Sequence, residues 1–344
     1  MRYREAERAE SHVADSEERT VGDESGDERV RRYATAGLFL VTALLFGTAF
    51  AGIEVGLTAL PPVLFAALRF DVGALVLLAV VAVRGGYWRP LTGADYRAVV
   101  VSAVFLVSLN AVLLFVGQQY TTSGAAAVMF SLAPVLSPLF ARFLLPDERI
   151  SAVGAVGILL GLVGVVVVVA PDPTRLLAAD AVGQALVAVA AVSVAFGSVL
   201  LRRIDPDVGS LAMTAWAMTL SAALVHVASL ALGESAAAVA WTPVALGAVA
   251  YLGLFSTAGA FPAYFALIER VGPIRANLVT YAVPVVASVT GALVLLERIA
   301  ATTVVGFAVV VLGFVLVERD SLGEELATVR ARLGGRAPPD EADD

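Results

Sequence analysis

Residues 117–169 read GQQYTTSGAAAVMFSLAPVLSPLFARFLLPDERISAVGAVGILLGLVGVVVVV. The stretch contains two apolar runs, which are joined by a short charged turn over residues 142–150. Each run is about twenty residues long, and a helix of that length, rising about 1.5 Å per residue, crosses a hydrocarbon core of about 30 Å. The stretch therefore predicts two membrane-spanning helices.

The same pattern returns about 150 residues later, where residues 266–317 read ALIERVGPIRANLVTYAVPVVASVTGALVLLERIAATTVVGFAVVVLGFVLV. The matched residues are Pro134 with Pro284, Glu148-Arg149-Ile150 with Glu297-Arg298-Ile299, Gly157 with Gly306, and Gly164 with Gly313. The chain is therefore predicted to contain a helical unit that has been duplicated inside a membrane.

The composition places the whole chain in the membrane class. Of its 344 residues 59% are hydrophobic, and the mean hydropathy is +0.87, well above that of soluble proteins. There is no cysteine, so disulfides and thiolate metal sites are excluded. The net charge of −7 arises in two polar tails, residues 1–32 and 318–344, which we predict to be disordered and cytoplasmic.

Ten apolar runs between the tails predict an all-α polytopic membrane protein. The expected spans are 35–57, 61–83, 96–118, 121–143, 150–170, 180–201, 209–232, 244–266, 273–295 and 299–317. They divide into two repeats of five spans, residues 33–171 and residues 172–317.

Arginine supplies every basic residue, and its distribution predicts the orientation. With ten spans and a cytoplasmic N-terminus, twenty arginines fall on the cytoplasmic side, whereas only Arg175 and Arg298 fall outside. This bias predicts that both termini are cytoplasmic. Because each repeat has an odd number of spans, the two repeats run in opposite directions, as in many secondary transporters.

Short motifs in the two halves resemble those of a known family. They are Gly47-Thr48-Ala49-Phe50, Ala67-Leu68-Arg69-Phe70, Ala133-Pro134, the Glu148-Arg149-Ile150 turn, Val283-Pro284, and the glycines that follow each turn. Residues 35–318 thereby resemble EamA-type transporters of the drug/metabolite transporter superfamily. The resemblance implies secondary active transport of small metabolites such as amino acids, their derivatives or drug-like solutes, usually outward across a prokaryotic plasma membrane.

Other functions remain open at this point. One is import of a nucleoside- or sugar-like solute, and another is a non-transporting role such as lipid scrambling. Enzyme motifs are missing, since there is neither an HExxH sequence nor a P-loop. We expect a solute and the lipid bilayer as partners, with no cofactor, metal or nucleic acid. The sequence leaves open a coupling ion such as the proton, and a monomer or homodimer.

Two prolines and several polar residues near the middle of the spans are candidates for the substrate path. Proline removes a backbone N–H and frees the carbonyl four residues earlier, which in a membrane must face protein or a wet cavity. The path candidates are Thr48, Asn110, Ser131, Pro134, Thr257, Asn277, Tyr281 and Pro284. Any one hydroxyl could instead bond to its own helix.

Charged residues in the first two spans suggest a second feature. Arg69 lies about eight residues into its span, or roughly 12 Å at the helical rise, and needs a carboxylate from another helix or a wet cavity. Glu54, near the outer end of the neighbouring first span, is the nearest candidate by depth, so we predict a Glu54–Arg69 ion pair, which leaves Asp71 to face the path and bind a proton or cationic group. The alternative is that Glu54 lies among the headgroups and Arg69 extends outward to meet them.

Overall fold

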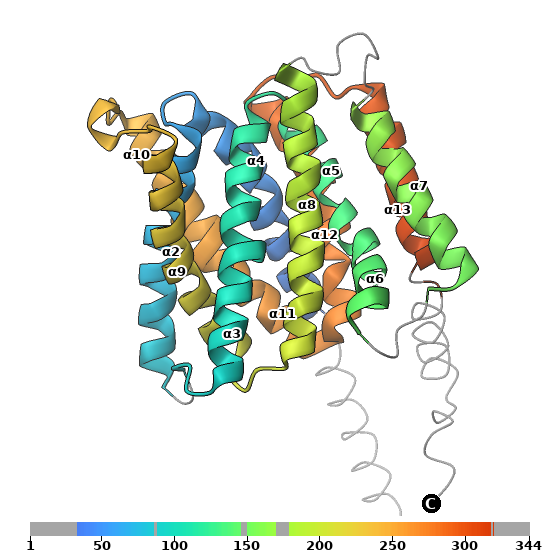
Figure 1. The fold of residues 1–344 in the computed structure, drawn as a ribbon. Coiled ribbons are helices and arrows are strands. Elements are labelled where there is room, and N and C mark those ends of the chain that lie inside the picture. Colours follow the sequence, from blue (N-terminus) through green and yellow to red (C-terminus); the bar gives the residue numbers. More distant parts are fainter. Residues whose placement is uncertain (1–32, 86–87, 146–149, 170–178, 318, 320–344) are drawn as a thin grey trace, which may run out of the picture.

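The computed structural model describes residues 33–85, 88–145, 150–169, 179–317 and 319. These residues form a bundle of helices with no strand among them (Figure 1). The predicted all-α membrane fold is therefore confirmed. Apart from Arg319, the two predicted tails lie outside the described residues.

Within the described part of the chain, eight helical segments are long and apolar enough to cross a membrane. The described helices are the first helix Tyr33–Leu57, α2 Pro62–Arg84, α3 Gly93–Val101, η1 Ser102–Leu109, α4 Asn110–Gln118, α5 Ser123–Phe130, α6 Leu132–Leu144, α7 Ala152–Val169, α8 Ala179–Ile204, α9 Ser210–Ala231, η2 Ala236–Ala238, α10 Pro243–Tyr251, η3 Leu252–Gly259, α11 Ala260–Asn277, α12 Val279–Val294 and α13 Ala301–Val317. The count of ten spans is not confirmed, because α12 and α13 are shorter, with 16 and 17 residues. The ninth span was expected to begin at residue 273, but α11 continues through Asn277.

Arginines gather at the end of the bundle that is lowest in Figure 1. Arg84 closes α2, Arg142 lies in the last turn of α6, and Arg202 and Arg203 lie in the last turn of α8. We call this the Arg-rich end, and the other end, which carries η2, the opposite end. The arrangement agrees with the arginine bias in the sequence, while the end that faces the cytoplasm stays a prediction.

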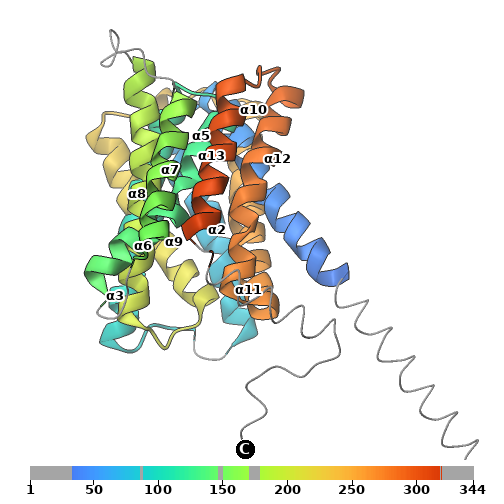
Figure 2. The same ribbon diagram turned by 90° about the vertical axis from the view of Figure 1, so that its right-hand side faces the viewer.

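The helices α7 and α13 lie side by side in both ribbon views (Figures 1 and 2). A Cβ on Gly157 would lie 2.5 Å from the carbonyl oxygen of Gly313, and one on Gly164 would lie 2.7 Å from that of Gly306. The helices are therefore antiparallel, and only glycine allows their backbones to approach so closely. Gly157 thus faces Gly313, the match of Gly164, and Gly164 faces Gly306, the match of Gly157. A two-fold axis that relates the two repeats produces this pattern. This contact supports two repeats of opposite direction.

The third helix of each repeat contains a π-helical segment. The segments η1 and η3 are eight residues long and begin 150 residues apart. The helices before them, α3 and α10, begin after Thr92 and Thr242, whose hydroxyls accept hydrogen bonds from the backbone N–H groups of Asp95 and Ala245. π-Helical turns are rare and frequently occur at functional sites, so these segments direct attention to the space between them.

Candidate functional site

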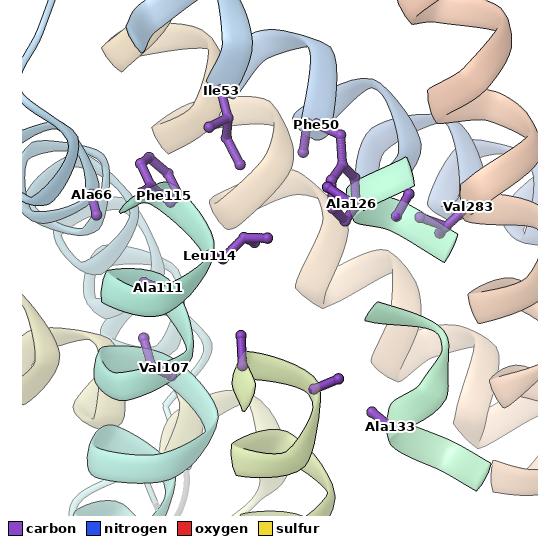
Figure 3. Packing of buried hydrophobic residues seen from close by; sticks show 14 of the residues in the cluster. Phe50, Ile53, Ala66, Val107, Ala111, Leu114, Phe115, Ala126, Ala133 and Val283 are labelled. Atoms are coloured by element: carbon purple, nitrogen blue, oxygen red, sulfur yellow. The ribbon is translucent and has the colours of Figure 1, made fainter. Parts of the chain in front are cut away.

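A cavity of about 480 Å³ lies inside the bundle, with walls from both repeats. Its volume is in the range of small-molecule pockets. Phe50 of the first helix, Leu114 of α4 and Ala133 of α6 lie on its wall together with Val283 of α12. Figure 3 shows these four buried side chains converging on one region from different helices.

Both π-helical segments contribute polar side chains to the wall. Ser102 comes from η1, and Ser256 and Thr257 come from η3. All three residues are buried, and the hydroxyl of Ser256 has no hydrogen-bond partner among the described residues. Because an unpaired buried hydroxyl is costly, a bound solute or water is the natural partner for this group. The sequence did not predict either π-helical segment. The only regularity that links the two segments is their matched position, 150 residues apart, in the two repeats.

Four of the predicted path residues lie on the cavity wall, namely Asn110, Ser131, Pro134 and Thr257. The amide nitrogen of Asn110 donates to the carbonyl oxygen of Leu106 at 3.3 Å. The amide oxygen of Asn110 is buried and has no partner among the described residues, so it can accept a hydrogen bond from a solute.

Three other path candidates do not belong to this wall. The Thr48 hydroxyl accepts a hydrogen bond from the Tyr251 hydroxyl at 2.6 Å. The ring of Tyr281 packs on Phe314, with 4.3 Å between the ring centroids, and Pro284 is buried within α12. The side chain of Asn277, the remaining candidate, lies outside the described residues.

The two matched prolines have different local settings. Pro284 lies inside the continuous helix α12. Pro134 instead lies in the first turn of α6, just after the break at Ser131 that separates α5 from α6. A proline costs little in a first turn, where the backbone N–H would have no helical partner. The span is therefore interrupted at Ser131, which lies on the cavity wall, directly before the turn that contains Pro134.

Arg69 is the one charged residue among the described residues of the cavity wall. Its guanidinium carbon lies 4.5 Å from the ring centroid of Phe70 and 4.6 Å from that of Phe115. Its Nε atom is buried without a hydrogen-bond partner, and no described carboxylate forms an ion pair with it. The site therefore holds a cation between two aromatic rings with no counter-charge from the described residues.

The predicted ion pair between Glu54 and Arg69 is not formed. The carboxylate of Glu54 instead lies 3.5 Å from the side-chain nitrogen of Gln118, which also donates to the carbonyl oxygen of Phe50 at 2.6 Å. Arg69 turns into the cavity, whereas Glu54 lies nearer the end of its helix and turns toward α4. Depth along two helices does not determine rotation about their axes.

The expectation that Asp71 faces the path is also wrong. Asp71 does not lie on the cavity wall; its carboxylate lies 2.8 Å from the Nε2 atom of His226 on α9. Both side chains are substantially exposed on the outside of the bundle, 45% for Asp71 and 37% for His226. The pair joins α2 to α9 at a surface that lipid would cover. A two-residue separation rotates a side chain by about 200° on a helix, which places Asp71 away from Arg69.

At the opposite end, two glutamates from the second repeat cap helices of the first. Glu297 accepts hydrogen bonds from the backbone N–H and the hydroxyl of Ser123, at 3.1 and 2.7 Å, where α5 begins. Glu234 accepts from the backbone N–H groups of Val63 and Leu64, at 3.1 and 2.6 Å, where α2 begins. Carboxylates are favoured at helix N-termini because of the unpaired N–H groups and the helix dipole. The matched Glu148 lies outside the described residues.

The cavity wall extends toward both ends of the bundle. It includes Leu201 near the end of α8 and Thr214 near the start of α9. Toward the opposite end the wall stops at Ile53 and Leu114, beyond which the Glu54–Gln118 contact and the Glu297 cap lie. These contacts lie between the cavity and the opposite end of the bundle.

The described residues contain no group of three or more acidic or histidine side chains that could hold a metal ion.

The EamA-like transporter family matches the chain twice, over residues 34–170 and 181–319. The chain belongs to this family. It is therefore a multi-pass membrane transporter protein, and the resemblance found in the sequence is confirmed.

Relatives of this EamA-like protein carry transporter names. It is 32% identical over 287 residues to an uncharacterised transporter of Archaeoglobus fulgidus, covering 81% of this chain and 96% of the relative. It is 30% identical over 257 residues to YedA, an uncharacterised inner membrane transporter of Escherichia coli, covering 74% and 81%. A solved crystal structure with 24% identity superposes with a TM-score of 0.60 over 83% of this chain and 97% of that chain, which supports the fold alone.

Proposed function

We propose that this EamA-like protein is a secondary active transporter that moves a small organic solute through the central cavity by alternating access. The observation that carries the proposal is that the cavity wall combines helices of both repeats, including η1 of the first and η3 of the second. In transporters built from inverted repeats, the solute binds between the repeats, and rocking of one against the other exposes the site to each side in turn.

The polar groups favour transport over lipid scrambling. Buried Ser102, Ser131 and Thr257 face the internal cavity, whereas a scramblase needs a polar track along the surface that meets the lipid. On that surface, the Asp71–His226 pair is one isolated polar contact between the described parts of α2 and α9. An isolated pair does not provide a path for a headgroup.

For the solute and its direction, we propose export of small metabolites, such as amino-acid derivatives or drug-like compounds, across a prokaryotic plasma membrane. Both termini would be cytoplasmic, and a coupling ion such as the proton would supply the driving force. Import of a nucleoside- or sugar-like solute is the alternative. The cavity volume accommodates either kind of solute.

The test is a solute screen in proteoliposomes, with and without an imposed proton gradient, and with Pro134→Ala and Pro284→Ala as variants. We expect gradient-dependent movement of at least one solute class and a slower initial rate in Pro134→Ala, since this residue lies on the wall. Flipping of fluorescent lipids without solute movement would replace the transport proposal by a scramblase. Full activity of both variants and of the double variant would show that the prolines serve only the fold.

A further inference from the structure

Arg69 places one positive charge on an otherwise uncharged cavity wall. The rest of the described wall consists of apolar, aromatic, hydroxyl and amide side chains, with no aspartate, glutamate, histidine or lysine. An ion removed from bulk water is costly unless it is paired. A solute that enters this cavity meets a cation that has no protein counter-ion among the described residues.

The surroundings of Arg69 hold its side chain but leave its hydrogen-bonding capacity unused. The rings of Phe70 and Phe115 lie within 4.6 Å of the guanidinium carbon, and such cation–π contacts fix the position of the group. The guanidinium makes no hydrogen bond to any described residue, and its Nε is buried. A planar fork of N–H donors in this state is suited to bind a carboxylate through two parallel hydrogen bonds.

The remainder of the wall suits the rest of such a solute. Aromatic side chains surround the space, among them Phe46, Phe130, Phe261 and Tyr264. Rings of this kind bind flat apolar groups in stacked or edge-to-face arrangements. An ammonium group is a poorer match, because the described wall offers it no carboxylate and the nearby guanidinium repels it.

We propose that the transported solute is a monoanionic organic acid with an aromatic or branched apolar body and no ammonium group, and that Arg69 binds its carboxylate. This inference rests on the transport function proposed above and names the solute class for the same cavity. Asn110 and Ser256, which have buried oxygens without partners, lie on the same wall and are available for a second polar group on the solute.

A series of four ligands that share a phenylpropyl body tests the charge preference of the purified protein. They are 3-phenylpropionate, its neutral amide 3-phenylpropanamide, the cation 3-phenylpropylamine and the zwitterion phenylalanine. Titration calorimetry should rank the acid above the amide and the zwitterion, with the amine weakest. Equal or tighter binding of the amine or phenylalanine would overturn the proposal, and so would the absence of binding by all four.

Variants of Arg69 test the assignment of the binding group. Arg69→Met keeps an apolar stem against Phe70 and Phe115, and it should weaken binding of 3-phenylpropionate by at least about tenfold while leaving the amide nearly unchanged. Arg69→Lys keeps the charge but loses the fork, so its loss should be smaller. Arg84→Met, at the exposed end of the same helix, is the matched control and should bind as the wild type does.

The same variants in proteoliposomes distinguish a failure of the proposed transport function from a failure of the proposal that Arg69 binds the solute carboxylate. If a solute is transported and Arg69→Met moves it at the wild-type rate, the transport function stands and the assignment of Arg69 fails. If Arg69→Met does not fold, the ligand ranking on the wild type and the result for Arg69→Lys decide the matter. Equal loss of acid and amide binding in Arg69→Met would indicate a structural role and would overturn the proposal.

Discussion

The cap formed by Glu297 gives a quantitative prediction about closure of the opposite end. Its carboxylate accepts two hydrogen bonds from Ser123, which link the end of the second repeat to the start of α5. Hydrogen bonds to a charged group contribute about 1.5–3 kcal/mol each, whereas neutral ones contribute about 0.5–1.5 kcal/mol. Glu297→Gln keeps one oxygen and loses the charge, so the link should weaken by about 2–4 kcal/mol.

If this link breaks when the opposite end opens, the same free energy shifts the equilibrium between closed and open states. A change of about 2–4 kcal/mol corresponds to a factor of roughly 30 to 1,000 in that equilibrium. Because the chain has no cysteine, a single Leu114→Cys on the cavity wall is a specific reporter. A thiol reagent supplied from the opposite side should modify it much faster in Glu297→Gln than in the otherwise wild-type protein.

Ser123→Ala provides the graded control for this prediction. It removes the hydroxyl donor at 2.7 Å and leaves the backbone N–H, so it should raise the labelling rate less than Glu297→Gln does. The reasoning fails if Glu297→Gln lowers the thermal unfolding temperature but leaves the labelling rate of Leu114→Cys unchanged. That outcome would mean that the cap persists in every conformation and only stabilises the fold.

Further predictions concern topology, packing and the lipid-facing pair. In intact cells, a membrane-impermeant maleimide should modify Ala237→Cys but reach Gly93→Cys only after permeabilisation, since the two residues lie at opposite ends of the bundle and the arginine bias places Gly93 inside. Gly157→Val should lower the thermal unfolding temperature, because its side chain would strike the backbone of the facing helix, and overpacking typically costs about 1–3 kcal/mol. Asp71→Leu and His226→Leu should each destabilise by about 1–3 kcal/mol by leaving a partner unpaired, whereas the double variant should recover most of that loss in a thermal-unfolding cycle.

Each of these predictions has a defined opposing result. Labelling of Gly93→Cys without permeabilisation would reverse the predicted orientation of the chain. Gly247→Ala serves as the packing control, because a Cβ at Gly247 meets nothing within 4 Å. Equal unfolding temperatures for Gly157→Val and Gly247→Ala would show that close helix contact at Gly157 does not limit the size of the side chain. Additive losses in the Asp71–His226 cycle would show that the pair contributes no interaction energy.

The duplicated pattern was readable from the sequence because its signals are local. Apolar runs of span length predict helices, and the matched prolines and glycines predict the duplication. The contact of Gly157 with Gly313 and of Gly164 with Gly306 was not predicted, because no local pattern states which helices are neighbours. Proline and charge were less reliable as stop signals. The sequence suggested a loop near residues 267–272, yet α11 continues through them to Asn277.

The side-chain arrangement of the site was much less predictable. Glu54 was the nearest carboxylate to Arg69 by depth, yet Glu54 contacts Gln118 and Arg69 lies over the ring of Phe115. The contact of Asp71 with His226 depends on which helices are neighbours, which no local pattern states. The π-helical segments have no distinctive residue type, so only the repeated offset could have suggested them.

The antiparallel contact between α7 and α13 has an evolutionary consequence. Each half contributes the same two glycine positions, so two identical copies of one half, inserted in opposite orientations, would form the same seam. A contact of this kind can exist before the gene is duplicated and fused. After fusion the two halves can differ in sequence. A buried arginine can then arise in one half without a second arginine at the symmetry-related position of the other. The single cation at Arg69 is the kind of asymmetry that a symmetric ancestor could not have had.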